Sequence, residues 1–170
     1  MAKVRNMQLS DADAMLRLSL ATRLDTYLPL LTDAYRLQFE QDHLYTELHR
    51  KSYNDHLNKY LNKTSISCLV VENDSNVCGY VKFQHRPGYI LITNLYINPT
   101  EQGRGYGKEL LSSVESTSGA CHLKLDVAVT NKKAIRFYEH LGFTKEKLLK
   151  KTYYGLSMQR MTKYSKIQTA

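Results

Sequence analysis

The most informative stretch of this sequence is Gln102-Gly103-Arg104-Gly105-Tyr106-Gly107-Lys108. It follows a run of strand-forming residues, 89–97, that is closed by Asn98-Pro99, and it precedes an amphipathic helix marked by Leu110 and Val114. Glycines let successive backbone N–H groups converge, and the following helix adds the positive end of its dipole. The stretch therefore indicates a phosphate-binding loop between a strand and a helix.

Two well-known phosphate-binding loops do not fit this stretch. A Walker loop needs a glycine where the chain has Gln102, and a serine or threonine after the lysine, where it has Glu109. A dinucleotide-binding G-x-G-x-x-G that starts at Gly103 needs a glycine at the position of Lys108. For the loop taken alone, a glycine-rich turn that binds nothing is an equally good interpretation.

Length and composition describe an ordinary globular chain. With 170 residues and 42% hydrophobic residues, we expect one domain over residues 1–165, followed by a tail at 166–170. No apolar run approaches the roughly 20 residues that cross a bilayer, so we expect no membrane partner. Residues 1–6 lack the apolar core of a signal peptide, which predicts a cytoplasmic protein.

Cys68, Cys78 and Cys121 are scattered among apolar residues, which is typical of reduced packing residues and indicates no metal site.

The basic residues are concentrated in the C-terminal part of the chain. The net charge is +8, and residues 101–170 carry thirteen basic and six acidic side chains, whereas residues 1–60 carry eight of each. Such an excess indicates an anionic partner, either a polyphosphate cofactor or nucleic acid. On charge alone, a solvated lysine-rich surface is the better interpretation, and the motifs must decide.

Hydrophobic periodicity predicts helices first and then a sheet. Ser10 is a candidate N-cap for a helix that ends near Leu24, and residues 33–61 form one long or two consecutive helices. Strands are expected at 66–71, 77–83, 89–97, 123–129, 143–153 and 156–163, with helices from 106 to before Gly119 and from Asn131 to Leu141. This order predicts an α+β fold, a mixed sheet with helices on both faces.

Two spaced motifs in this order resemble those of the GNAT superfamily of acyl-CoA-dependent N-acyltransferases. The first is Leu95-Tyr96-Ile97-Asn98-Pro99 followed by the glycine-rich loop. The second is Asn131-Lys132-Lys133-Ala134-Ile135-Arg136-Phe137-Tyr138, followed by Leu141-Gly142-Phe143. The resemblance implies a mostly antiparallel sheet of about seven strands with a splayed central pair. It also implies an N-acetyltransferase that moves an acetyl group from acetyl-CoA to a primary amine by direct attack in a ternary complex.

The resemblance further implies which residues hold the cofactor. The loop amides would bind the pyrophosphate, the strand backbone would pair with the pantetheine arm, and the second motif would flank that arm. The implied cofactor residues are Leu95, Tyr96, Ile97, Gln102, Gly103, Arg104, Gly105, Tyr106, Gly107, Lys108, Asn131, Ala134 and Phe137. For Asn131, a plain helix cap is an equally good interpretation. No metal is implied.

Tyr138 is the implied general acid, because a phenol keeps its proton throughout the physiological range and can protonate the leaving thiolate. The general base is less clear. Asp126 or Asp25 could serve as the base, but a structural role is the better interpretation of each, and a water relay is the preferred hypothesis. An alkyl ammonium with a pKa of about 10.4 costs roughly 4–5 kcal/mol to deprotonate at pH 7.

Two other classes of function compete with an enzyme: an acyl-CoA sensor without turnover, and a basic nucleic-acid-binding module. The chain has no tryptophan and no helix-turn-helix or zinc pattern, which argues against nucleic acid. The acceptor stays open among polyamine, aminoglycoside, amino acid and protein amines. The oligomeric state also stays open, a homodimer included.

Overall fold

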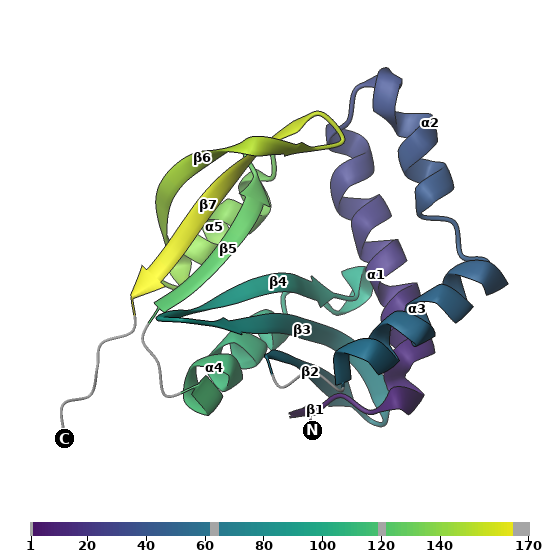
Figure 1. Ribbon diagram of the computed structural model, residues 1–170, viewed down its shortest axis with the longest axis vertical. Helices are drawn as coiled ribbons and strands as arrows, with labels where there is room; N and C mark the ends of the chain where they lie inside the picture. Colours follow the sequence, from purple (N-terminus) through teal and green to yellow (C-terminus); the bar gives the residue numbers. More distant parts are fainter. Residues whose placement is uncertain (1, 62–64, 119–121, 165–170) are drawn as a thin grey trace.

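The computed structural model describes residues 2–61, 65–118 and 122–164 (Figure 1). In chain order the elements are β1 (Lys3–Asn6), η1 (Leu9–Asp11), α1 (Ala12–Tyr27), η2 (Leu28–Leu30), α2 (Asp33–Asp42), α3 (Glu47–Leu61), β2 (Ile66–Asn73), β3 (Asn76–Arg86), β4 (Tyr89–Ile97), η3 (Pro99–Glu101), α4 (Tyr106–Ser118), β5 (His122–Ala128), α5 (Lys132–His140), β6 (Thr144–Tyr153) and β7 (Leu156–Tyr164), where η marks a 3₁₀ turn. None of the described helices is long and apolar enough to cross a membrane.

The strands form a single seven-stranded sheet in the order β1-β2-β3-β4-β5-β7-β6. All neighbours are antiparallel except β4 and β5, which pair in parallel only over Ile90–Ile92 and Leu123–Leu125. Beyond that point β4 continues to Ile97 and β5 to Ala128 without pairing with each other. Figure 1 shows the two strands diverging from a shared start. The expected α+β sheet with a splayed central pair is confirmed.

A β-bulge at Thr93 lies where the two strands part. The register between β3 and β4 shifts from Lys82–Asn94 to Phe83–Ile92, which leaves Thr93 as the extra residue, and its Oγ1 donates to the Lys82 carbonyl at 3.0 Å. A bulge bends its strand and increases the local twist. The bend turns the second half of β4 away from β5 and opens a slot between them.

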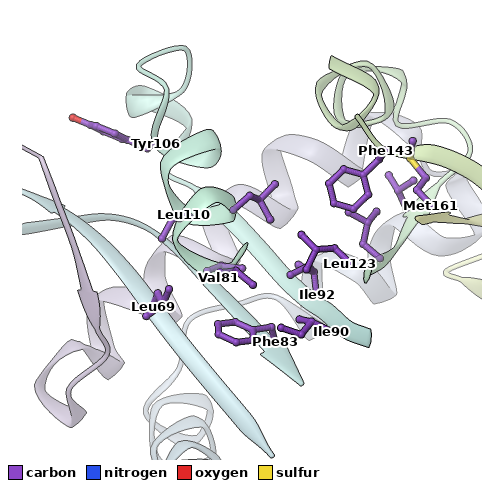
Figure 2. Close-up of a cluster of buried hydrophobic side chains, with 14 of the residues drawn as sticks. Leu69, Val81, Phe83, Ile90, Ile92, Tyr106, Leu110, Leu123, Phe143 and Met161 are labelled. Carbon is purple, nitrogen blue, oxygen red and sulfur yellow. The ribbon is translucent and has the colours of Figure 1, made fainter. Parts of the chain in front are cut away.

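The main hydrophobic core lies between the sheet and the helices α4 and α5. Figure 2 shows Val81 of β3 and Leu110 of α4 pointing toward one another, with Phe143 and Met161 beside Leu123 at the other end of the cluster. The sheet positions in this cluster alternate with residues that face the opposite side, as the period of two in a strand requires. This core holds α4 and α5 on one face of the sheet.

The N-terminal helices cover the opposite face. Met15 and Leu18 of α1 pack with Leu57 of α3 against Val70 and Tyr80 of the sheet. Helix α2 instead reaches the turn between β6 and β7, where the Tyr154 hydroxyl donates to Asp42 Oδ2 at 2.5 Å. The N-terminal segment is therefore tied to both halves of the splayed sheet.

The structure corrects the expectations for the N-terminal region. Strand β1 was missed, and it pairs antiparallel with β2 at the edge of the sheet. Ser10 is not an N-cap, because it lies inside η1, where Asp11 Oδ2 accepts from the Gln8 backbone N–H at 2.8 Å. Helix α1 continues to Tyr27, beyond the expected end near Leu24. Of the two alternatives for residues 33–61, the structure has two consecutive helices, α2 and α3.

The expectations for the later part of the chain are largely confirmed. Between the expected strands at 66–71 and 77–83, the chain turns at Asp74 and Ser75, both with positive φ angles (49° and 64°). Gly142 ends α5 with a φ of 88°. Cys68 and Cys78 are free thiols, and burial raises the pKa of Cys68 to about 12, so its thiol stays protonated. Cys121 lies outside the described residues.

Candidate active site

A cavity of about 810 Å³ opens where β4 and β5 part. Its walls come from the end of α1, the second half of β4, the glycine-rich loop, the end of β5 and the start of α5. Of the residues assigned from sequence, those that line it are Leu95, Tyr96, Ile97, Gln102, Gly103, Gly105, Tyr106, Gly107, Lys108, Asn131, Ala134, Phe137 and Tyr138. The fold thus brings both sequence motifs to one cavity.

The glycine-rich loop presents unpaired backbone donors. Gly103 and Gly105 have φ angles of +84° and +87°, which glycine adopts without strain. Within the described residues, the N–H groups of 103–107 donate to no protein acceptor, whereas those of Lys108 and Glu109 both reach the Gly105 carbonyl, at 3.0 and 3.1 Å. The Lys108 amide, which was expected to face the cofactor, is therefore already used. The amides before it form a site suited to an anion at the start of α4.

The side chains of the loop differ from the expectation at two positions. Arg104 does not line the cavity, because it turns toward Glu101, 3.4 Å away, and lines a neighbouring groove between β1 and α4. The Tyr106 side chain is buried and belongs to the main core cluster, at whose edge Figure 2 shows it, so its hydroxyl is not expected to serve as a cofactor contact. Lys108 is the cation of this loop that lines the cavity.

Gln102 links the two sides of the slot. Its Nε2 donates to the Ile97 carbonyl at 3.3 Å, and its Oε1 accepts from Lys133 Nζ on α5 at 2.6 Å. The Ile97 carbonyl also accepts from Thr22 Oγ1 on α1 at 3.2 Å. Gln102 and Thr22 therefore hold the end of β4 in place.

Asn131 is the N-cap of α5, since its Oδ1 accepts from the Ala134 N–H at 3.1 Å. The cap role considered from sequence is thus confirmed, and it leaves the side-chain amide group as the donor that lines the cavity. One turn later, Phe137 packs over Gly107 so closely that a Cβ on that glycine would lie 2.9 Å from Phe137 Cζ. The two motifs are therefore in direct contact.

Besides Tyr106 at the start of α4, three tyrosines from three other elements line the cavity: Tyr27 of α1, Tyr96 of β4 and Tyr138 of α5. The ring of Tyr138 is held between Phe137 and Phe143, with centroid distances of 5.2 and 5.5 Å. Burial raises the pKa of the Tyr138 hydroxyl, and the nearby hydroxyls of Tyr27 and Tyr96 raise it further. Tyr138 therefore keeps its proton at neutral pH. No sequence pattern marked Tyr27.

Tyr96 lies at the centre of a polar network on the α1 side. Its hydroxyl oxygen accepts from Arg23 Nε at 2.9 Å and from Asn94 Nδ2 at 3.3 Å. Arg23 Nη1 is 3.3 Å from Nε2 of His43 on α2. Sequence reasoning missed Arg23 and His43, because nothing near them in the chain marks their contacts.

The carboxylates at the cavity differ in their partners. Asp126 pairs with Lys151 at 2.6 Å and with Arg160, and although burial alone would raise its pKa, these hydrogen bonds hold the pKa below its usual value. Glu101 pairs with Arg104. Asp25 lines the cavity and has no cationic partner in the part of the chain that the structure describes. In the same described ranges, no three histidine, cysteine, aspartate or glutamate side chains gather as metal ligands would.

The match to a known protein family includes both motifs. The sequence model of the acetyltransferase (GNAT) family matches residues 28–143. No curated protein matches the sequence significantly. A PaiA N-acetyltransferase from Thermoplasma acidophilum, crystallised in complex with coenzyme A, is 18% identical with a TM-score of 0.76 over 97% of this chain and 99% of its own.

Two further solved structures share the fold. The ribosomal-protein-S18-alanine N-acetyltransferase from Escherichia coli is 17% identical, with a TM-score of 0.67 over 96% of this chain and 94% of its own. A spermidine N-acetyltransferase chimera that includes the Vibrio cholerae enzyme is 22% identical, with a TM-score of 0.70 over 96% and 95%. At these identities the likeness shows the fold alone. Since the family model covers more than half of the chain, the protein belongs to the acetyltransferase (GNAT) family.

Proposed function

We propose that this acetyltransferase moves an acetyl group from acetyl-CoA to a primary amine by direct attack within a ternary complex. The observation that carries the proposal is the run of unpaired amides at 103–107, which lies at one end of the slot between β4 and β5. Buried or clustered backbone donors are normally paired, and an anion at the start of a helix satisfies them. The coenzyme A complex of the Thermoplasma acidophilum protein supports the same cosubstrate.

The cofactor is expected to follow the slot. The pyrophosphate binds the amides of 103–107, and the pantetheine arm runs beside Leu95–Ile97, where β4 has no partner strand on the β5 side. Gln102, Asn131, Ala134 and Phe137 flank the arm. Lys108 adds a positive charge near the phosphates, whereas Arg104 must first leave Glu101 to do so.

The chemistry follows from the groups at the far end of the slot. The neutral amine attacks the thioester carbon, its C–N bond forms, and the C–S bond breaks to release the thiolate. Tyr138 hydrogen-bonds to the developing thiolate and stabilises it. Because burial raises the pKa of this hydroxyl, it keeps its proton at neutral pH and can act toward the thiolate as hydrogen-bond donor and general acid.

The amine must also lose a proton, and the carboxylates differ in their suitability as base. Arg160 and Lys151 occupy both oxygens of Asp126, so we assign it a structural role. Asp25 is free of cations within the described residues and lines the same cavity. We propose that the proton leaves through water toward Asp25.

The test is binding and turnover of acetyl-CoA by the purified protein. We expect acetyl-CoA at about 100 times its Kd to add about 2.7 kcal/mol of stability, measured as a rise in melting temperature. A panel of amines, followed by release of free thiol, then reports turnover. No protection by millimolar acetyl-CoA or CoA would overturn the cofactor assignment, and protection without turnover of any amine would leave an acyl-CoA sensor.

A further inference from the structure

A cation without a counterion, Arg23, lies beside the α1 wall of the cavity, where it bonds to the lining residue Tyr96. Arg23 is partly buried, and no carboxylate lies within ion-pair distance of it in the residues that the structure describes. Charges removed from water are normally paired, because the desolvation cost is high. An uncompensated arginine beside a ligand cavity therefore indicates an anionic group on the ligand.

The groups that are hydrogen-bonded to Arg23 do not neutralise its positive charge. His43 is 3% exposed, and its Nδ1 lies 2.7 Å from the Phe39 carbonyl, so Nδ1 carries the proton and Nε2 is free to accept from Arg23. Burial lowers the pKa of His43, and Arg23 lowers it further, which keeps the imidazole neutral. Arg23 is therefore bonded to a neutral imidazole and to a phenol, and neither group is a carboxylate counterion.

Tyr96 connects Arg23 to the cavity, because it accepts a hydrogen bond from Arg23 and also lines the cavity. A phenol oxygen has two lone pairs and one proton. Arg23 and Asn94 both donate to the Tyr96 oxygen and fill its lone pairs, so its proton must be donated to a third group. Tyr96 lines the cavity, and within the described residues no protein acceptor receives that proton.

The other charges near this wall form no ion pair with Arg23 in the described residues. Asp42, next to His43 in the chain, accepts instead from the Tyr154 hydroxyl at 2.5 Å. Lys82, opposite Asn94 on β3, is a further cation and not a counterion, and burial lowers its pKa. The carboxylate of Asp126 is neutralised by Arg160 and Lys151. In the described part of the chain, Asp25 is the one cavity carboxylate that lacks a cationic partner. A single free carboxylate can neutralise one ammonium group of a ligand, but not several.

We propose that the acceptor amine also carries a carboxylate, as an amino acid does. The carboxylate accepts the proton of the Tyr96 hydroxyl, with the Arg23 guanidinium directly behind it, while the ammonium is drawn toward Asp25. Polyamines and aminoglycosides, which carry several positive charges and no carboxylate, are disfavoured. The inference rests on the proposed acetyl transfer, and it selects one acceptor class from those that the sequence left open.

The test compares amino acids with the amines left after their decarboxylation. The pairs are lysine with cadaverine, ornithine with putrescine, and phenylalanine with phenethylamine, each measured as kcat/KM with saturating acetyl-CoA. A charge-assisted hydrogen bond discriminates by ~10–100-fold, and we expect the carboxylate member of at least one pair to be favoured by that factor. Equal turnover, preference for the decarboxylated members, or turnover of neither overturns the inference.

Variants of Arg23 and Tyr96 distinguish recognition of the substrate carboxylate from a purely structural role. We expect Arg23→Gln and Tyr96→Phe each to reduce the preference for the amino acid, measured within each variant as its kcat/KM divided by that of the decarboxylated amine, by ~10–100-fold, because each variant weakens recognition of the carboxylate. Arg23→Lys should recover part of the preference. A loss of equal size for both members of a pair would make Arg23 a structural residue only. If Arg23→Gln does not fold, the wild-type ratios and Tyr96→Phe decide.

Protection by acetyl-CoA is measured on the same samples. Its absence counts against the proposed transfer, whereas protection together with turnover that ignores the carboxylate counts against this inference alone.

Discussion

Gly107 and Phe137 lie in direct contact, and through them the loop that begins α4 meets the helix α5. A Cβ on Gly107 would approach Phe137 Cζ to 2.9 Å, closer than real Cβ atoms are found. The two residues are 30 positions apart in the sequence, one in each motif. Both residues line the cavity, so their contact joins the glycine-rich loop to α5 at the wall of the site.

Gly107→Ala should therefore destabilise the protein even though alanine is the better helix former. Overpacking typically costs ~1–3 kcal/mol, against a gain in helix propensity of up to about 1 kcal/mol. In a Phe137→Leu background the obstructing ring atom is absent, so the same change should become stabilising by roughly 0.5–1 kcal/mol. Urea denaturation of the four proteins measures this reversal of sign, and the same sign in both backgrounds would contradict it.

Gly105→Asp should abolish acetyl-CoA binding, because it places a negative charge where the phosphates are proposed to lie. Gly88→Asp is the matched control. Gly88 has a φ of +78°, close to the +87° of Gly105, and a Cβ at either position meets nothing within 4 Å, but Gly88 is in the β3–β4 turn away from the cavity. Both variants should lose similar stability, and only the control should keep its thermal shift with acetyl-CoA. Retained binding by Gly105→Asp would remove the loop from the site.

Tyr138→Phe should lower kcat and leave the affinity for acetyl-CoA nearly unchanged. General-acid contributions are ~10²–10⁴-fold, and we expect the lower end, since a thiolate with a pKa of about 8.5 is a tolerable leaving group. Tyr164→Phe, at a position that is 67% exposed, is the control and should behave like the wild type. Steady-state kinetics with the best acceptor measure the effect. A kcat within about twofold of the wild type, where chemistry limits the rate, would exclude Tyr138 from the mechanism.

Acetyl-CoA binding should weaken as salt is added, since the Debye length falls from ~10 Å at 0.1 M to ~3 Å at 1 M. Lys108→Gln should weaken binding at low salt and reduce the salt dependence, because Lys108 lines the cavity. Lys150→Gln removes the same charge from an exposed position on β6 outside the cavity and serves as the control. Titrations at several ionic strengths provide the measurement. Equal effects of the two variants would make the charge a general surface property.

Asp11→Asn should destabilise the fold at neutral pH. Asp11 accepts from Arg5 at 2.7 and 2.9 Å and from the Gln8 N–H at 2.8 Å, and these hydrogen bonds hold its pKa below the usual value despite burial. We expect a loss of about 1–3 kcal/mol in the free energy of unfolding. Asp33→Asn, which removes an exposed ion pair with Arg36, should cost much less.

The difference in the free energy of unfolding between the wild type and Asp11→Asn should decrease as the pH falls. Because the pKa of Asp11 is lower in the folded state, its contribution is fully present above the unfolded pKa of about 3.9 and is lost as the pH falls through the folded pKa. The wild type and Asp11→Asn should therefore converge in stability below about pH 4. A difference that is constant from pH 7 to pH 3 would show that the carboxylate charge is not responsible.

The sequence by itself determined the features that depend on neighbours along the chain. Glycines at 103 and 105 adopt the positive φ angles that their loop requires, and Asn131 caps the helix that begins one residue later. Both motifs could therefore be located from the order of residues alone, and so could the alternating strands from 66 onward. Strand β1 could not, since Lys3–Asn6 is a short edge strand that forms because β2 offers it unpaired backbone.

Only the tertiary structure decided which side chains meet across the cavity. Arg23 and Tyr96 are 73 residues apart, and their hydrogen bond exists because α1 packs on the bent half of β4. Arg160 and Lys151 remove Asp126 from the candidates for a base, and Glu101 holds Arg104 outside the cavity. A side chain's partners are set by contacts between distant segments, and a local pattern carries no information about them.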